Sequence, residues 1–430
     1  MNTRSFFLMS LTLAGMIHAE SVKDREGAVR QDRAKLELDA RWNYNNVEQA
    51  FADAKKSGKP VMLVLRCVPC LACMGLDTGV LMASDEVTRE LDQFVCVRLI
   101  NCNALDMVRF QFDYDLSFSV LFLNADGTTY GRYGSWKHQK NSQETALEGF
   151  RKAMKAALAI HSSYPANKPA LTGKQPVEPP FKTPVEIPQL AEKYTPKLDW
   201  EGKVVGSCVH CHMIGSALQS WYRKEKKPLP EDLIYPFPEP ETIGLTMKSD
   251  EIAKVESVAA GSIAAKAGVK AGDELASFAG QPLVSIADVS WALHRTANAA
   301  TVACTVKREG KEVPLTLELP QGWRRKSQVT ERATIWPERG MALGGMRVEA
   351  HEGEGIGLKI KGVGQYGIHA TAKKSGFKEG DVLLAFDGIT SKITEGELIG
   401  HLLQNRQAGE KVTVKVKRGA ETKEIQLPMQ

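Results

Sequence analysis

Residues 59–73 read Lys-Pro-Val-Met-Leu-Val-Leu-Arg-Cys-Val-Pro-Cys-Leu-Ala-Cys. The apolar run over 60–65 has the length and composition of a strand that is buried on both faces. Cys67, Cys70 and Cys73 follow it directly, in two overlapping Cys-x-x-Cys frames. This spacing after a buried strand is typical of a redox-active dithiol. The stretch therefore predicts an α/β domain with thiol chemistry at the end of a central strand.

The sequence around this stretch alternates between helical and strand patterns from residue 42 to residue 163. In chain order the expected elements are helix 46–57 with Asn46 as its N-cap, strand 60–65, helix 84–91, strand 94–100, a hairpin over 119–133 and helix 144–161. The Asp126-Gly127 pair supplies the hairpin turn. Cys96 lies inside the second strand and Cys304 inside a later one, so we expect both to be buried core thiols.

This order of elements resembles the thioredoxin fold, in which Lys59-Pro60-Val61 would open the strand before Cys70-Leu71-Ala72-Cys73. The resemblance implies that Cys70 is the nucleophile and Cys73 the resolving cysteine of a thiol–disulfide oxidoreductase. A cysteine at a helix N-terminus gains reactivity because unpaired backbone N–H groups lower its pKa. The overlapping frame leaves two further roles open for Cys67, which can pair with Cys70 or resolve a second disulfide.

The loop before the hairpin departs from that fold. Thioredoxins carry a cis-proline there, beside the redox cysteines, whereas this chain has Ser117-Phe118-Ser119. The departure favours an alternative interpretation, in which the domain holds only a stabilising disulfide and the protein is a non-catalytic scaffold.

The segment Cys208-Val209-His210-Cys211-His212 has the spacing that attaches a c-type haem covalently. Cys208 and Cys211 would form the two thioether bonds, and His212 would be the proximal iron ligand. A zinc site is disfavoured because these side chains are too crowded to surround one ion without a second ligand pair. The sequence therefore predicts a haem c cofactor in the middle of the chain.

The N-terminus carries the pattern of a secretory signal over residues 1–19. Arg4 precedes an apolar run over 6–17, and Ala19 is a small residue suited to the cleavage position. No later run reaches the roughly 18 apolar residues of a membrane span, so none is expected after cleavage. The formal net charge of +5, without a dense basic tract, does not indicate nucleic acid binding. We expect a periplasmic or secreted protein.

Proline-rich stretches divide the middle of the chain. Residues 164–201 are rich in proline and poor in apolar runs, which predicts a semi-rigid extended linker. A second proline cluster spans 228–240. The haem motif therefore lies in a short segment, 202–240, where a covalent cofactor would supply part of the core.

Residues 242–319 and 355–427 look like one unit repeated. The first unit carries Ala-Gly-Val-Lys-Ala-Gly-Asp-Glu-Leu over 267–275, and the second carries Ser-Gly-Phe-Lys-Glu-Gly-Asp-Val-Leu over 375–383. Each pattern predicts a short helix that ends at glycine, a Gly-Asp turn and a following strand. The pattern resembles PDZ domains of bacterial type. We expect mainly-β PDZ domains over 241–320 and 355–430, joined by a connecting segment over 321–354.

In each unit a helix is expected to form one wall of a groove, over 286–295 in the first and 395–404 in the second. The resemblance implies that a peptide adds as an extra strand in this groove and that backbone N–H groups near a Gly-Leu pair bind its C-terminal carboxylate. The expected peptide-binding residues are Ile243, Gly244, Leu245, Ile356, Gly357 and Leu358.

The whole order resembles an exported bacterial family of thioredoxin-like/PDZ proteins, some of which carry selenocysteine near the redox motif. The leading interpretation is a multidomain, exported redox protein. In it a thioredoxin-like domain exchanges thiols with a partner protein, a haem segment follows, and two PDZ domains recruit protein C-termini. Because PDZ domains occur in proteins of unrelated function, fold alone does not decide the activity.

Overall fold

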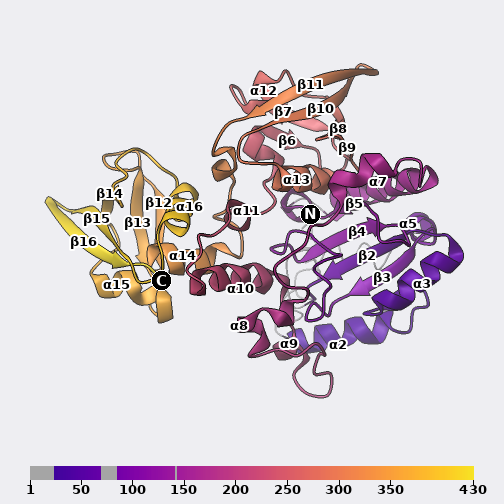
Figure 1. Cartoon of the computed structure of the whole chain (residues 1–430), viewed down its shortest axis with the longest axis horizontal. Helices are drawn as coiled ribbons and strands as arrows, with labels where there is room; N and C mark the ends of the chain where they lie inside the picture. The colour runs from indigo at the N-terminus through magenta and orange to yellow at the C-terminus, as the bar shows by residue number, and fades with distance from the viewer. Residues whose placement is uncertain (1–23, 69–84, 141–142) are drawn as a thin grey trace, which may run out of the picture.

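The computed structural model describes residues 24–68, 85–140 and 143–430, which form a wide, three-lobed molecule (Figure 1). The predicted signal over 1–19 lies outside these residues. So do Cys70 and Cys73, and the expectations for them stay predictions.

The N-terminal domain is built on a five-stranded sheet in the order β1-β3-β2-β4-β5. Its strands are β1 Trp42–Tyr44, β2 Val61–Arg66, β3 Val95–Leu99, β4 Phe118–Leu123 and β5 Thr129–Tyr133. The strands β1 and β2 run parallel to β3, whereas β4 is antiparallel to β2 and forms the predicted hairpin with β5. Every residue of β2 is buried, as the continuous apolar run predicted.

Helices cover both faces of this sheet (Figure 1). They are α2 Arg25–Leu36, α3 Val47–Ser57, α5 Asp85–Leu91, α6 Trp136–Lys140 and α7 Gln143–Ser162. The side chain of Asn46 caps α3 by accepting a hydrogen bond from the Gln49 backbone N–H, and Gly58 ends the helix with φ 71°. On opposite faces, Phe51 of α3 and Phe150 of α7 pack in separate apolar clusters, so the sheet has a core on each side.

The stretch 164–201, expected to be an extended linker, is instead folded onto this domain. It contains η2 Lys168–Lys174, η3 Pro184–Glu186 and α8 Pro188–Ala191. Proline stands in the first turn of each of these helices, where its missing N–H has no cost. Leu171 and Ile187 are fully buried in the two cores of the domain. Three prolines of this stretch therefore mark helix starts, and the stretch is folded rather than an extended spacer.

The segment with the Cys-x-x-Cys-His motif is also part of the N-terminal domain, which corrects the expectation of a separate small unit. It forms α9 Val204–Ser207, α10 Cys211–Lys224, α11 Glu231–Ile234 and η4 Pro240–Ile243. Val209, Cys211 and Ile214 lie in the same apolar cluster as β2 and β3. The other end of α10 reaches the C-terminal part of the chain, where Arg223 Nη2 donates to the Gln430 carbonyl at 2.7 Å.

The first repeat contains β6 Leu245–Met247, β7 Val255–Val258, α12 Ile263–Lys266, β8 Glu274–Phe278, β9 Gln281–Pro282, α13 Ile286–Arg295, β10 Ala300–Arg308 and β11 Lys311–Leu319. The second region contains η5 Trp323–Lys326, α14 Ile335–Leu343, β12 Met346–Ala350, β13 Leu358–Val363, η6 Gly367–Ala370, α15 Thr371–Ser375, β14 Val382–Phe386, α16 Glu395–Asn405, β15 Lys411–Arg418 and β16 Glu421–Pro428. The sheet order is β11-β10-β8-β9 in the first, beside the β6-β7 pair, and β12-β13-β14-β15-β16 in the second.

The shared Gly-Asp pattern has the same structural role in both repeats. Asp273 accepts a hydrogen bond from the Lys270 N–H and pairs with Arg308 at 2.7 Å. Asp381 bonds the Lys378 N–H and pairs with Arg418 in the same way. Each aspartate closes its turn and ties that turn to the strand that ends in the arginine.

The second repeat begins earlier than the sequence predicted. The carbonyl of Gly244 accepts from the Ala259 N–H, and Leu245 pairs with Val258 on the neighbouring strand. In the second repeat, the carbonyl of Gly345 accepts from the Gly364 N–H, and Met346 pairs with Val363.

Gly345 is therefore the counterpart of Gly244, and both have left-handed φ, 86° and 88°. The expected counterpart was Gly357. Gly357 lies instead directly before β13, the second strand of the unit. The Ile356 N–H donates to the Leu383 carbonyl, and the Ile356 carbonyl accepts from the Ile393 N–H. The loop Ile356-Gly357-Leu358 thus lies inside the folded sheet, where Ile356 has no backbone N–H left for a peptide carboxylate.

Among the helices of the described residues, none combines the length and apolar character that crossing a membrane requires.

Candidate functional site

Cys67 stands at the carboxyl end of β2, as the sequence predicted. It is buried and disulfide-bonded. Its backbone N–H donates to the Ser117 carbonyl at 3.0 Å, and the Arg66 guanidinium donates to the same carbonyl at 3.1 Å. The Ser117 loop therefore lies directly against the cysteine motif, at the position where thioredoxins place their cis-proline.

The Cys-x-x-Cys-His segment reaches the same place from the other end of the domain. The Nδ1 atom of His210 lies 3.4 Å from Cys67 Sγ. Burial lowers the pKa of His210, and the neighbouring His212 lowers it further, so the imidazole is neutral at neutral pH and can accept a proton. The sequence assigned no role to His210, yet it is the motif residue that contacts Cys67.

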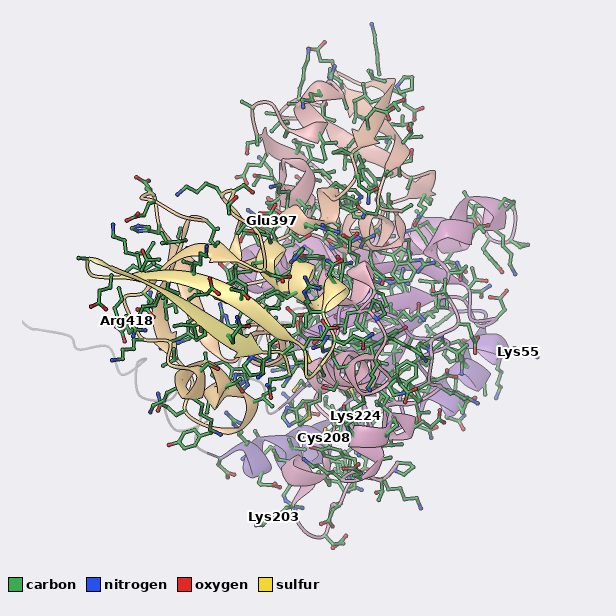
Figure 2. All side chains as sticks on the ribbon, turned by 60° about the vertical axis from the view of Figure 1, so that its left-hand side comes forward. Lys55, Lys203, Cys208, Lys224, Glu397 and Arg418 are labelled. Carbon is green, nitrogen blue, oxygen red and sulfur yellow. The ribbon has the colours of Figure 1, made fainter. Side chains whose placement is uncertain are left out.

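Cys102 completes a cluster of cysteines. Its Sγ lies 3.4 Å from Cys211 Sγ, and both side chains are buried. Cys208 lies on the same side of the molecule as Lys203 (Figure 2) and directs its Sγ toward the Ile100 carbonyl at 3.8 Å. Together with Cys67, these three free cysteines line one small apolar cavity whose other walls include Val29, Ile100, Leu198 and Val204.

Asn103, the residue after Cys102, holds the cluster together. Its amide donates to the Thr195 carbonyl at 2.7 Å and to the Ser207 carbonyl at 2.8 Å. Its side-chain oxygen accepts from the Val209 N–H at 2.7 Å. One fully buried side chain thus fastens the chain on both sides of Cys208 to the end of β3.

The thiols of Cys102 and Cys208 are protonated at neutral pH. The hydrogen bond to Cys211 and burial raise the pKa of Cys102, and burial raises the pKa of Cys208 to about 12. Because thiolates are the reactive species, exchange in this cluster needs a proton acceptor, and His210 is the neutral base beside it. By contrast, Cys96 and Cys304 are core thiols, as predicted: both are buried, and burial raises the pKa of each to about 12.

The sequence identified Cys67, Cys208, Cys211 and His212 as site residues but placed them in two sites, whereas the structure brings Cys67, Cys208 and Cys211 into one. The sequence patterns did not identify Cys102 and Asn103 as site residues. A signal for them was present, since Cys102 follows the strand that runs parallel to β2, and the carboxyl ends of parallel neighbours meet at one edge of a sheet. No local sequence pattern predicted that residues 208–211 lie beside Cys67 and Cys102, because this contact depends on how residues 164–207 fold back onto the domain.

The arrangement does not fit a covalently attached haem. Cys211 directs its sulfur into the protein core toward Cys102, and the cavity that it shares with Cys208 has about the volume of one water molecule. His212 lies at the first turn of α10, with its ring centroid 5.9 Å from that of His210. A haem would need the apolar side chains around the cavity to move apart. Within residues 24–68, 85–140 and 143–430, no group of three or more histidine, cysteine or acidic side chains is arranged to hold a metal ion.

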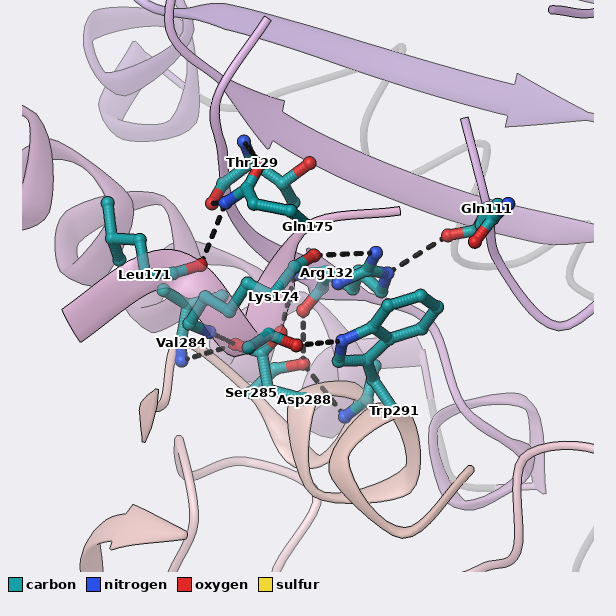
Figure 3. A network of polar contacts seen from close by, with 12 residues as sticks. Gln111, Thr129, Arg132, Leu171, Lys174, Gln175, Val284, Ser285, Asp288 and Trp291 are labelled. Carbon is teal, nitrogen blue, oxygen red and sulfur yellow. Dashed lines mark hydrogen bonds and ion pairs between the residues drawn. The ribbon is translucent and has the colours of Figure 1, made fainter. Parts of the chain in front are cut away.

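The groove helix of the first repeat, α13, is docked on the N-terminal domain (Figure 3). The Asp288 carboxylate accepts hydrogen bonds from Lys174 Nζ at 2.6 Å and from the Arg132 N–H at 3.0 Å. Lys174 belongs to η2 and Arg132 to β5, so three segments meet at this carboxylate. The Trp291 indole donates to the Gly173 carbonyl at 2.8 Å, and the Arg132 guanidinium lies 3.6 Å from the centroid of that indole. All residues from 286 to 293 are buried, so a peptide that docks on this helix competes with the N-terminal domain.

The groove helix of the second repeat, α16, is covered by apolar contacts from other parts of the chain. The Tyr235 hydroxyl donates to the Gly396 carbonyl at 2.8 Å, and the Tyr235 ring lies against Gly400. Val329 lies next to Gly396. Helix α14 packs on both α16 and β12, the two elements that border the groove.

Comparison with protein-family models agrees with this architecture. Residues 42–125 match the thioredoxin-like family, and residues 242–319 and 345–429 each match the PDZ domain family. The second match begins at Gly345, which the strand pairing identifies as the counterpart of Gly244. A search of curated proteins found no match to the chain. The chain thus contains a thioredoxin-like domain and two PDZ domains, which is the composition of a redox-related protein with protein-binding domains.

Proposed function

We propose that this protein is a thiol–disulfide redox protein whose reactive cysteines lie at the end of β2 and whose PDZ domains bind partner proteins. The observation that carries the proposal is the disulfide-bonded Cys67 beside His210, in contact with the cavity that Cys102, Cys208 and Cys211 line. A purely structural disulfide needs neither a neighbouring base nor three free thiols. An exchange site uses both, because attack on a disulfide requires a thiolate and a group that takes up its proton.

Thiol trapping of the full chain across a series of glutathione redox buffers tests this function. We expect a two-electron transition that Cys67→Ser removes. Cys96→Ser is the matched control, since it changes a buried thiol of the same sheet that bonds only the Leu91 carbonyl in the described structure. A Cys67 that remains oxidised across the whole series would instead support the scaffold interpretation. Cys70→Ser and Cys73→Ser then identify which Cys-x-x-Cys frame is active.

Binding of protein C-termini by the PDZ domains is part of the proposal. The left-handed Gly244 and Gly345, each before an edge strand, support it. A peptide with a free apolar C-terminus should bind more tightly than its amide, and the competition described above predicts weak binding to the intact chain. Calorimetry with both peptides decides this, and equal affinities would exclude carboxylate binding.

Export stays a prediction from residues 1–19. Covalent haem, predicted from residues 208–212, does not fit the positions of Cys208 and Cys211 described above. Both are tested in one preparation from a host with haem c maturation, by the N-terminal sequence of the exported protein and by the mass of the peptide with Cys208 and Cys211. A haem adduct on that peptide would add a one-electron centre to the proposal. A colourless protein with unmodified Cys208 and Cys211 would remove the haem.

A further inference from the structure

The Cys102–Cys211 contact joins two distant parts of the chain. Cys102 follows β3, and Cys211 is the first residue of α10, 109 positions later. Their sulfur atoms are 3.4 Å apart, so closing a disulfide of about 2.05 Å requires a movement of about 1.4 Å. Small rotations of the two side chains can cover a distance of this size.

The backbone around this pair is already held in place. Asn103 is bonded to the chain at Thr195, Ser207 and Val209, and therefore fixes the approach of the segment before α10 to the end of β3. The apolar side chains of the shared cavity exclude water from both sulfurs. The two thiols thus meet in an ordered, preformed arrangement rather than by a chance approach of mobile side chains.

We propose that Cys102 and Cys211 are a second redox couple of this protein, which alternates between two thiols and a disulfide. This rests on the thiol–disulfide function proposed above and adds a site to it. The oxidant is a disulfide, and Cys67, which is disulfide-bonded, lines the same cavity.

The reaction is a balanced thiol–disulfide exchange. The Cys211 thiolate attacks one sulfur of the oxidant disulfide, which breaks that S–S bond, forms a mixed disulfide and releases one thiolate. Cys102, once deprotonated, attacks the Cys211 sulfur, forms the Cys102–Cys211 bond and releases the second thiolate. Two electrons pass to the oxidant, and the two protons lost by Cys102 and Cys211 are taken up by its two sulfurs.

Oxidation of this couple would fasten α10 to the sheet. The same helix contacts α14 through Gln219, which donates to Glu338 Oε1 at 2.6 Å, and contacts the second PDZ domain through Arg223, which donates to the Arg406 carbonyl. The redox state of the couple would therefore change how firmly α10 is held at the junction between the N-terminal domain and the second PDZ domain. A Cys102–Cys211 disulfide is also incompatible with haem attachment at Cys211, because a sulfur held in a thioether cannot form this disulfide.

The test uses the full chain, reduced and then equilibrated with mixtures of oxidised and reduced glutathione, alkylated in acid and mapped as peptides without reduction. We expect a linked peptide pair that contains Cys102 and Cys211, lighter than the two free peptides by two hydrogen atoms, at the oxidising end of the series. Dithiothreitol should abolish it. Hydrogen exchange in the first turns of α10 should slow on oxidation in the wild-type chain and stay unchanged in Cys102→Ala, with Cys304→Ala as the matched control that retains the effect.

The outcomes separate this inference from the proposed function. A Cys67 transition without the Cys102–Cys211 pair would overturn the second couple and leave the proposed function standing. The linked Cys102–Cys211 pair without a Cys67 transition would overturn the exchange proposed for Cys67 and leave the second couple standing. A Cys208 disulfide in place of the pair, or a haem adduct on Cys211, would also overturn it. Mapping of the wild-type chain decides the matter even if the variants fold poorly.

Discussion

The two PDZ domains have the same fold but are attached to the rest of the chain through different contacts. Helix α13 of the first domain docks through a buried ion pair, Lys174–Asp288, and a set of oriented hydrogen bonds (Figure 3). Helix α16 of the second domain is covered by Tyr235 and Val329, which fit against Gly396 and Gly400. The first contact centres on charge pairing in the buried interior. The second combines close packing with an ion pair, Arg339–Glu395 at 2.6 Å, that joins α14 to α16.

The difference shows that two copies of the same fold in one chain can dock on their neighbours through unrelated contacts. The residues that build each domain, such as the Gly-Asp turns and their arginine partners, occur in both. The residues that dock each domain differ, because they face unlike surfaces. A buried carboxylate that loses its partner is left as an uncompensated charge, whereas a packed surface loses only the contacts that are removed. The two attachments should therefore fail in different ways.

The largest effect is expected from Asp288→Ala. The substitution leaves Lys174 buried without a counter-charge, and breaking a buried ion pair in this way costs about 3–5 kcal/mol. Denaturant unfolding of the full chain, with hydrogen exchange in α13 as the local readout, measures it. Asp288→Asn is the matched control, since its amide keeps an acceptor for the backbone N–H groups but not the charge, and its cost should be intermediate. A loss below about 1 kcal/mol for Asp288→Ala would contradict a docking role for the ion pair.

A smaller effect is expected from Gly400→Ala in the second PDZ domain. The added methyl group would overlap the hydroxyl of Tyr235, and overpacking of this kind costs about 1–3 kcal/mol. Gly206→Ala is the control, because the atom nearest to its new Cβ, Lys203 Cβ, is 3.7 Å away. Tyr235→Phe removes the overlapping oxygen, so the double variant should lose less than the sum of the two single changes. Strict additivity in that double-mutant cycle would exclude the proposed overlap.

Acid should weaken the first attachment through buried histidines. Burial lowers the pKa of His138, which stacks on Tyr133, to about 3, and lowers that of His294, which stacks on Phe237 next to α13. Below pH 6.5 the unfolded chain binds protons that these folded side chains reject, so stability falls as the pH drops from 6.5 toward 3. For His138 the loss at pH 5.5 is about 1.4 kcal/mol.

Urea unfolding at pH 7 and at pH 5.5 measures this loss. The variant His138→Leu should lose less stability between the two pH values than the wild type, because it has one fewer site that titrates only when unfolded. An identical pH dependence in both proteins would show that His138 is not buried in its neutral form.

The smallest effect is expected at the rim of the second attachment. Lys326 pairs with Glu397 of α16 at 2.6 Å, but its side chain is 67% exposed. Solvent screens such a pair, so Lys326→Ala should change the unfolding free energy by only about 0–1 kcal/mol. A larger loss, measured beside Gly400→Ala under the same conditions, would contradict the screening of this exposed pair.

Much of the fold could be predicted from local patterns. The apolar run before Cys67 specified the buried strand, Asn46 specified a helix start, and the repeated Gly-Asp turns specified two PDZ domains. The start of the second domain was misplaced because Ile356-Gly357-Leu358 looks like Ile243-Gly244-Leu245, and only strand pairing distinguishes it from Gly345-Met346. The proline-rich stretch was misread because prolines that begin short helices and prolines of an extended linker have the same composition.

By itself, then, the sequence determined the types of domain, the position of Cys67 after its strand and the burial of Cys96 and Cys304, because these follow from periodicity and from residues near in the chain. Only the tertiary structure decided that Cys102, His210 and Cys211 lie with Cys67, and that the two PDZ domains dock through different contacts. Those contacts join residues 100 or more positions apart in several cases. Such pairings depend on which surfaces bury each other, and no local pattern encodes that choice.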